Sequence, residues 1–210
     1  MTKASLAPLV RRDAPWEALF AADPFHPGWE DVLYEPQVLT GHYDPAEDER
    51  AARVRGHFWA GYADWIRQRR LREEGRLWLV SGEPLSSETR RAFDLDGARY
   101  ASVRAFYDSL KVDDDATRAQ IAACAYDGPW GRIRRPRPAA FRYGSQRFEV
   151  GSIEHCVLVA RATEAKVRAH QDVRAALLGT HRARLYMGAF AALGRSMPFA
   201  LMVLRERIRS

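Results

Sequence analysis

Three lysines among many arginines are the residues of this chain best suited to covalent chemistry. Of the 33 lysine and arginine residues, only Lys3, Lys111 and Lys166 are lysines. Unlike the guanidinium of arginine, a lysine amine can lose its proton and attack a carbonyl-like carbon. The two interior lysines, Lys111 and Lys166, are therefore expected to have a task that arginine cannot perform.

Lys111 has two polar neighbours at helical spacing. Tyr107 and Asp108 precede it by four and three residues, so a helix here gathers a phenol, a carboxylate and an amine on one surface. If its surroundings favour the neutral amine, such a lysine can form an imine with the anomeric carbon of an opened ribose. The alternative is an ordinary surface ion pair between Asp108 and Lys111, which would contribute about a few tenths of a kcal/mol.

A second set of candidate groups lies on a later predicted helix. Glu154 and His155 fall in its first turn, and Lys166 and His170 lie near its end. Glu154 is also explained as an acid that complements the helix dipole.

Between the two sets, residues 126–147 form an arginine-rich segment with Trp130, which predicts a loop. Its arginine forks can clamp phosphates, although solvated charge explains the segment as well.

Capping residues and apolar spacing indicate the elements that must position these groups. The expected helices span residues 102–111, 113–125, 152–170, 172–178 and 198–208, and Pro198 is expected to open the last one. Short extended segments are expected at 77–80 and 93–100, with a turn at Asp96-Gly97.

Two stretches of the sequence echo each other. Each is extended and aromatic, starting at Phe93 or Phe141, and each leads into a helix capped by a serine, Ser102 or Ser152.

The N-terminal part looks like an accessory arm. Residues 1–43 are rich in proline and aromatic residues, and Asp44-Pro45-Ala46-Glu47 has the pattern of a helix start. A long helix is expected to follow and to end near Gly75. We therefore divide the chain into an arm with a long helix, residues 1–76, and a domain spanning residues 77–210.

Composition limits the classes of protein that fit. With 47% hydrophobic and 29% charged residues, the chain has a globular composition. No apolar run is long enough for a membrane helix and no signal peptide is evident, so the expected location is the cytoplasm and no membrane partner is expected. The net charge of +6 permits a polyanionic partner. The usual nucleotide, zinc and hydrolase motifs are absent, so neither a metal nor a cofactor is expected.

Several ordered segments of the chain resemble the NADAR superfamily over about residues 77–208. The resemblance rests on Leu85-Ser86-Ser87-Glu88, on the run from Phe93 through Asp96-Gly97 and Ser102-Val103 to Lys111, on Ala165-Lys166-Val167, and on Leu201-Met202-Val203-Leu204-Arg205. It implies a mainly helical fold and N-glycoside hydrolysis without a metal. The implied substrates are ADP-ribosylated bases or phosphoribosylamino-pyrimidine intermediates of riboflavin synthesis, and Lys111 and Lys166 match the two lysines of the family.

The chain also departs from the family pattern. The glutamate and histidine of the main motif fall on Arg104 and Ala105, and its asparagine falls on Ser87. A late aspartate and tryptophan have no counterpart between residues 185 and 194. Because glycoside hydrolysis needs a carboxylate, Glu88, Asp108 or Glu154 would have to supply it.

The sequence therefore predicts a mainly α protein, α+β with a few short strands, that binds a nucleotide or sugar-phosphate ligand and hydrolyses an N-glycosidic bond. The expected catalytic residues are Lys111, Asp108 and Glu154, and the expected ligand-binding residues are Ser87, Glu88, Arg104, Tyr107, Trp130, His155, Lys166 and His170. Arg104 is expected to contact phosphate. Two alternatives stay open: an accessory protein that binds nucleotides without catalysis, and a module that binds nucleic acid through its arginine loop.

Overall fold

The computed structural model describes residues 6–10, 14–22, 29, 32–34, 77–80, 84–124, 140–187 and 191–210. Over these residues the protein is mainly α-helical with three two-stranded sheets, which confirms the expected fold class. Its helices are the 3-10 turn η1 (Ala7–Val10), α2 (Trp16–Ala21), α5 (Val103–Ser109), α6 (Asp115–Ala123), α7 (Ile153–Ala169), α8 (Gln171–Gly179) and α9 (Ala191–Arg209). The strands are β1 (Leu77–Leu79), β2 (Phe93–Leu95), β3 (Ala98–Tyr100), β4 (Ala140–Tyr143), β5 (Gln146–Glu149) and β6 (Arg184–Tyr186).

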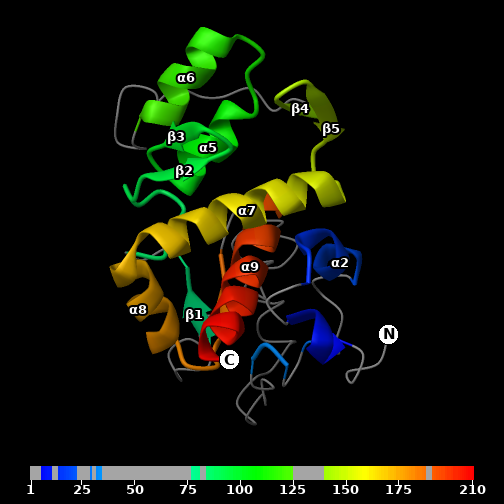
Figure 1. Ribbon diagram of the computed structural model, residues 1–210, viewed down its shortest axis with the longest axis vertical. Coiled ribbons are helices and arrows are strands. Elements are labelled where there is room, and N and C mark those ends of the chain that lie inside the picture. Colours follow the sequence, from blue (N-terminus) through cyan, green and yellow to red (C-terminus); the bar gives the residue numbers. More distant parts are fainter. Residues whose placement is uncertain are drawn as a thin grey trace, which may run out of the picture.

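Helix α7 runs through the centre of the molecule. The elements β2, β3, α5, α6 and the β4–β5 hairpin lie on one side of it, while α2, α8 and α9 lie on the other (Figure 1). Residues 156–160 of α7 are all buried, as expected for a helix covered on several sides. Ser152 caps α7 by accepting a hydrogen bond from the amide of His155, and Lys166 and Arg168 lie in its last turn.

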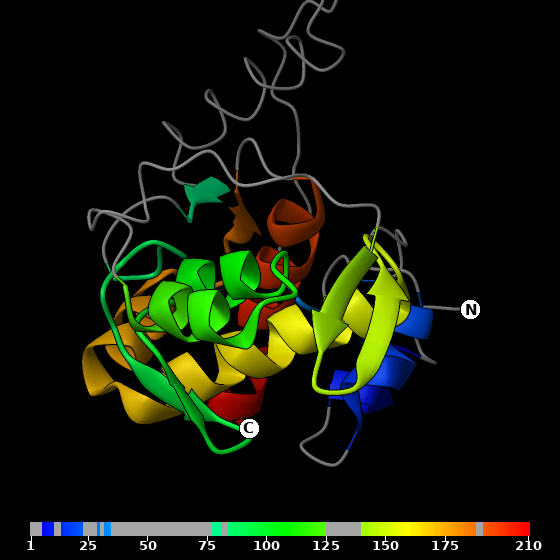
Figure 2. The same cartoon turned by 90° about the horizontal axis from the view of Figure 1, so that it is seen from above.

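Two antiparallel hairpins precede the two helices capped by serine. β2 and β3 pair Phe93 with Tyr100 and lead to α5, while β4 and β5 pair Phe141 with Phe148 and lead to α7. Figure 2 shows the β4–β5 hairpin beside the first turns of α7. The echo in the sequence therefore corresponds to two hairpin–helix units.

The turns of these hairpins use backbone conformations that favour special residues. Asp96 and Gly97 have φ values of 50° and 79°, which suits a two-residue turn between antiparallel strands. The prediction of a loop over residues 126–147 is wrong from residue 140 onward. Residues 140–143 pair there with residues 146–149 as the antiparallel β4–β5 hairpin. Residues 125–139 lie outside the described part of the chain.

Helix α9 begins earlier than the sequence predicts. Pro198 was expected to open the last helix, but it lies inside α9, seven residues after the start at Ala191. A proline there removes one backbone hydrogen bond. Met197 and residues 199–204 are nevertheless all buried, so packing of the helix against the core offsets that loss.

The described N-terminal residues are part of the core rather than a separate layer. Leu6, Leu19, Trp29 and Leu33 have no exposed surface. They pack beside α7 and α9, and the aromatic ring of Phe199 in α9 lies 5.3 Å from the ring of Trp29. The long helix expected before Gly75 lies outside the described residues, so the division of the chain at residue 76 stays a prediction.

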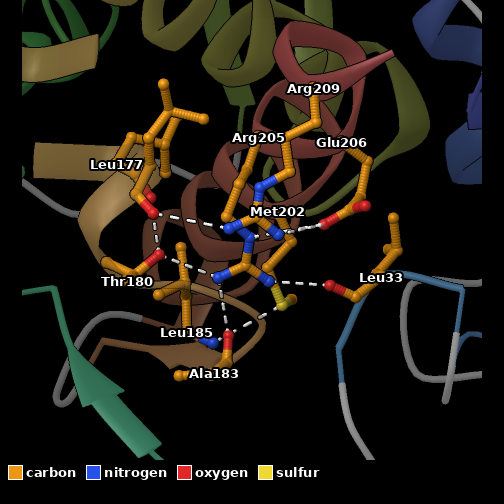
Figure 3. A network of polar contacts seen from close by, with 10 residues as sticks. Leu33, Leu177, Thr180, Ala183, Leu185, Met202, Arg205, Glu206 and Arg209 are labelled. Atoms are coloured by element: carbon orange, nitrogen blue, oxygen red, sulfur yellow. Dashed lines mark hydrogen bonds and ion pairs between the residues drawn. The ribbon is translucent and has the colours of Figure 1, made fainter. Parts of the chain in front are cut away.

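Arg205 of α9 ties three distant segments together. Its fully buried guanidinium donates to the carbonyl of Leu33 at 2.7 Å and to the Thr180 hydroxyl and the Ala183 carbonyl at 2.8 Å (Figure 3). Burial lowers the pKa of Arg205 to about 10, so the side chain still carries its charge at neutral pH. This network fixes the N-terminal segment and the end of α8 onto α9.

Strands β1 and β6 form a parallel pair that joins distant parts of the chain. Leu77 is opposite Arg184, and Leu79 is opposite Tyr186.

Within the described ranges, none of the helices has both the length and the apolar composition needed to cross a bilayer.

Candidate functional site

Helix α5 carries Arg104, Tyr107 and Asp108, and Lys111 lies two residues beyond its end. Ser102 caps it by accepting from the amide of Ala105 at 3.0 Å. On its buried side, the ring of Phe106 lies 5.0 Å from Tyr100 of β3 and 5.8 Å from Tyr143 of β4. Both hairpins therefore hold α5 in place and fix the orientation of its polar face.

An ion-pair network runs along that polar face. Asp108 accepts from the Lys111 ammonium at 2.6 Å through one carboxylate oxygen and from Arg104 Nε at 2.9 Å through the other. Arg104 Nη1 also lies 3.6 Å from Glu88 Oε1. We call Glu88, Arg104, Tyr107, Asp108, Lys111 and His155 the Asp108 cluster.

The network is largely withdrawn from water. The side chains of Arg104 and Lys111 are each 12% exposed and that of Asp108 is 8% exposed. The Asp108–Lys111 pair is therefore not the exposed surface pair that was the alternative from the sequence. Removing one partner of such a pair leaves an uncompensated charge with little water around it, which is costly.

Aromatic rings support the charged groups. The Lys111 ammonium lies 4.6 Å from the centre of the Tyr107 ring. The rings of Phe141 and His155 lie 5.4 Å and 5.5 Å from Tyr107 and 4.6 Å from each other. Sequence reasoning missed Phe141 as a member of this group, and the signal that could have found it is its place, like that of Phe93, at the start of an aromatic stretch before a capped helix.

Burial keeps the two neighbouring titratable rings neutral. It raises the pKa of Tyr107, with a further contribution from the negative charge of Asp108. Burial, together with the positive charge of Lys111, lowers the pKa of His155 to about 4. At neutral pH the Asp108 cluster therefore contains a neutral phenol and a neutral imidazole beside its ion pairs.

The loop that carries Ser87 and Glu88 is docked onto the start of α5. The Ser87 carbonyl accepts from the backbone amide of Arg104 at 2.8 Å. The Glu88 amide donates to the hydroxyl of Ser86 at 3.2 Å. Backbone contacts of this kind hold Glu88 within reach of the Arg104 guanidinium.

Lys166 of α7 holds the same loop through two hydrogen bonds. It is 1% exposed, and its ammonium donates to the carbonyls of Pro84 at 2.8 Å and Ser86 at 2.7 Å. These contacts explain why a compact ammonium stands on α7 at this point. Lys166 therefore positions the loop of the Asp108 cluster rather than facing the ion pairs themselves.

The other predicted site residues lie apart from the ion pairs. Glu154 is exposed, and hydrogen bonds from its own amide and from Ser152 lower its pKa, so it acts as a helix-terminal acid. His170 Nε2 lies 2.7 Å from the carbonyl of Ala92 at the junction of α7 and α8. Trp130 lies outside the described residues. No group of histidine, cysteine and acidic residues in the described ranges is arranged to hold a metal ion.

Comparisons with known proteins add one structural likeness. No family model matches the chain, and no curated protein matches it significantly. The chain is similar to the NMR structure of the E. coli protein YbiA, with 21% sequence identity and a TM-score of 0.43. The match covers 64% of this chain and 86% of YbiA. The resemblance to the NADAR superfamily stays a prediction from the sequence motifs.

Proposed function

We propose that the protein binds a ribose-phosphate or ADP-ribose-type ligand at the Asp108 cluster and hydrolyses an N-glycosidic bond. The observation that carries this proposal is the Lys111–Asp108–Arg104 network, which lies beside the aromatic rings of Tyr107 and its neighbours. It places an amine, a carboxylate and a guanidinium in a site largely withdrawn from water, where electrostatic interactions are stronger than in bulk solvent.

Asp108 is the carboxylate best placed to assist the reaction. Glycosidic cleavage builds positive charge on the sugar, which a nearby carboxylate stabilises. Asp108 can also accept a proton from attacking water or from Lys111, because it is already hydrogen-bonded to that ammonium.

Lys111 has two possible roles that predict different products. As a stabiliser it stays an ammonium, and water attacks the sugar. As a nucleophile it first gives a proton to Asp108, and its neutral Nζ then attacks C1 of the ribosyl group. The C1–N bond to the base breaks, its electron pair leaves with the base, and the base takes up a proton. The product is a glycosylamine, and its ring opens when the C1–O4 bond breaks and O4 takes up the proton held by Asp108, which leaves a protonated imine at Nζ. Water then adds to C1, and the C1–Nζ bond breaks to release the sugar and restore the ammonium.

Turnover of a panel of N-glycosides tests the proposal. We expect release of ADP-ribose or ribose phosphate from at least one of NAD, ADP-ribosylated nucleobases and phosphoribosylamino-pyrimidines. Lys111→Ala should lower kcat/KM by about a hundredfold or more, since it removes a charged group from the site of reaction. Arg99→Ala is the matched control, because it breaks the exposed Asp94–Arg99 pair, which is not part of the Asp108 cluster, and should leave turnover unchanged. Turnover by Lys111→Ala at the wild-type rate would exclude this site.

Reductive trapping separates the two roles of Lys111. Borohydride added during turnover should fix the sugar to Lys111, and peptide mass mapping is simple because the chain has so few lysines. An active enzyme that yields no adduct would assign Lys111 the role of stabiliser.

A non-catalytic binding protein is the second candidate. It is favoured by the short Asp108–Lys111 contact, which holds the amine as an ammonium. In that case a nucleotide would raise the melting temperature of the protein, the Lys111→Ala variant would lose the shift, and no product would form.

A further inference from the structure

His155 carries a hydrogen-bond donor for which the described part of the chain offers no acceptor. The backbone amide of Gly151 donates to His155 Nδ1 at 2.9 Å. An amide nitrogen can only donate, so Nδ1 must be the acceptor, and the single proton of the neutral ring is on Nε2. Gly151 itself has a φ value of 90°, a left-handed backbone conformation that favours glycine.

The Nε2–H group is buried without an acceptor. The His155 side chain has no exposed surface, and within the described residues Nε2 has no hydrogen-bond partner. Leaving a buried donor unsatisfied costs about 1–3 kcal/mol. A histidine at this position therefore leaves a donor for an acceptor that the described residues do not supply.

The surrounding charges indicate what kind of acceptor fits. Arg104 and Lys111 contribute two positive charges, and Asp108 and Glu88 contribute two negative charges that contact them directly. A phosphate would have to compete with both carboxylates for the guanidinium of Arg104. With neutral Tyr107 and His155 beside these balanced pairs, the cluster suits an uncharged oxygen better than a phosphate.

We propose that His155 Nε2 donates a hydrogen bond to a hydroxyl or ring oxygen of the ribose of the bound ligand, an inference that rests on the proposed function. The Asp108 cluster then recognises the sugar, and the phosphate of the ligand is bound outside it. His155 is a binding residue in this scheme and does not transfer a proton.

Long-range proton–nitrogen NMR spectra of histidine-labelled protein at pH 7.5 test this assignment. Without ligand, His155 should show the Nε2–H tautomer. Ribose 5-phosphate should shift its Nε2 and Hε2 resonances, inorganic phosphate should not, and the exposed His181 serves as the internal control. An equal shift with inorganic phosphate would overturn the assignment to the sugar.

Variants give an independent measure. His155→Phe keeps an aromatic ring but lacks the donor, and it should weaken ribose 5-phosphate binding about tenfold, equivalent to about 1.4 kcal/mol. His155→Gln, whose side-chain amide can donate, should recover part of the affinity, and His181→Asn should bind as the wild type does. If His155→Phe does not fold, the NMR titrations of the wild-type protein with ribose 5-phosphate and inorganic phosphate test the role of His155 by themselves.

The outcomes also separate the two proposals. Ribose 5-phosphate binding that leaves the His155 resonances and the His155→Phe affinity unchanged would overturn the role of His155 alone. Failure of every sugar-phosphate and nucleotide to bind would overturn both this role and the proposed function.

Discussion

At the scale of single residues, the candidate site gathers two cations around one carboxylate. Asp108 follows Arg104 by four residues and precedes Lys111 by three, spacings that place side chains on one helix face. Its carboxylate therefore lies 2.9 Å from Arg104 Nε and 2.6 Å from the Lys111 ammonium.

The neutral state of His155 predicts a dependence of stability on pH. Its pKa is about 4 in the folded protein and 6.5 in the unfolded chain, so between these values the unfolded state binds more protons. The contribution of His155 is complete above about pH 6.5 and is lost as the pH falls to about 4, with a total loss of about 3 kcal/mol. Urea unfolding at pH 7 and pH 4.5 measures the fall in the free energy of unfolding. The part of that fall that is absent in His155→Phe is the contribution of His155.

The comparison isolates one histidine from the rest of the protein. His155→Phe should show a smaller fall in stability over the same pH range, because it has no ring to protonate. His181→Asn, changed at an exposed turn, should keep the wild-type dependence. Parallel curves for wild type and His155→Phe would contradict the assignment of this titration to His155.

At the scale of elements, the site depends on the loop of residues 84–90 and the two helices that hold it. Lys166 of α7 binds two of its carbonyls, and the amide of Arg104 in α5 binds a third at Ser87. The loop therefore bridges α5 and α7 through its backbone.

Loss of the Lys166 contacts should destabilise the protein and loosen the site. In Lys166→Met, two carbonyls lose their charged donor, so the free energy of unfolding should fall by about 2–4 kcal/mol. Arg168→Met is the control on the same helix, because its side chain is 78% exposed and should change stability by about 0.5 kcal/mol or less. Chemical denaturation measures both, and equal effects would show that the Lys166 contacts contribute little to stability.

Local elements could be predicted from the sequence, while roles fixed by distant contacts could not. The serine caps of α5 and α7 and the turn at Asp96-Gly97 depend on residues a few positions apart, and the sequence predicts them well. The loop carbonyl that Lys166 contacts at Ser86 lies 80 positions away, so nothing near the lysine reveals its task. The start of α9 was predicted wrongly at Pro198 for the same reason. Burial against distant elements, rather than the proline, decides where this helix begins.

At the scale of the whole molecule, α9 fastens the N-terminal segment to the rest of the protein. Arg205 contacts Leu33, and Arg207 donates to the carbonyls of Val10 and Ala14 while lying over the ring of Trp16. Trp16 in turn donates to Glu164 of α7 at 2.7 Å. The described N-terminal residues are therefore integrated with the central helices.

Removal of the Arg205 side chain should be among the most damaging single changes. Arg205→Met leaves the Leu33 and Ala183 carbonyls without their donor in a fully buried site, so we expect a loss of about 3–5 kcal/mol. The exposed Arg174→Met on α8 is the control and should be close to neutral. Thermal unfolding compares the two, and equal melting temperatures would refute a central role for the Arg205 network.

The parallel pairing of β1 with β6 has a consequence for the order in which the chain folds. The two hairpin–helix units that build the Asp108 cluster consist of neighbouring segments, and such local contacts form early because little chain entropy is lost in closing them. β1 cannot pair until β6 has left the ribosome, more than a hundred residues later. During synthesis, the two hairpin–helix units are therefore complete before β1 and β6 can pair.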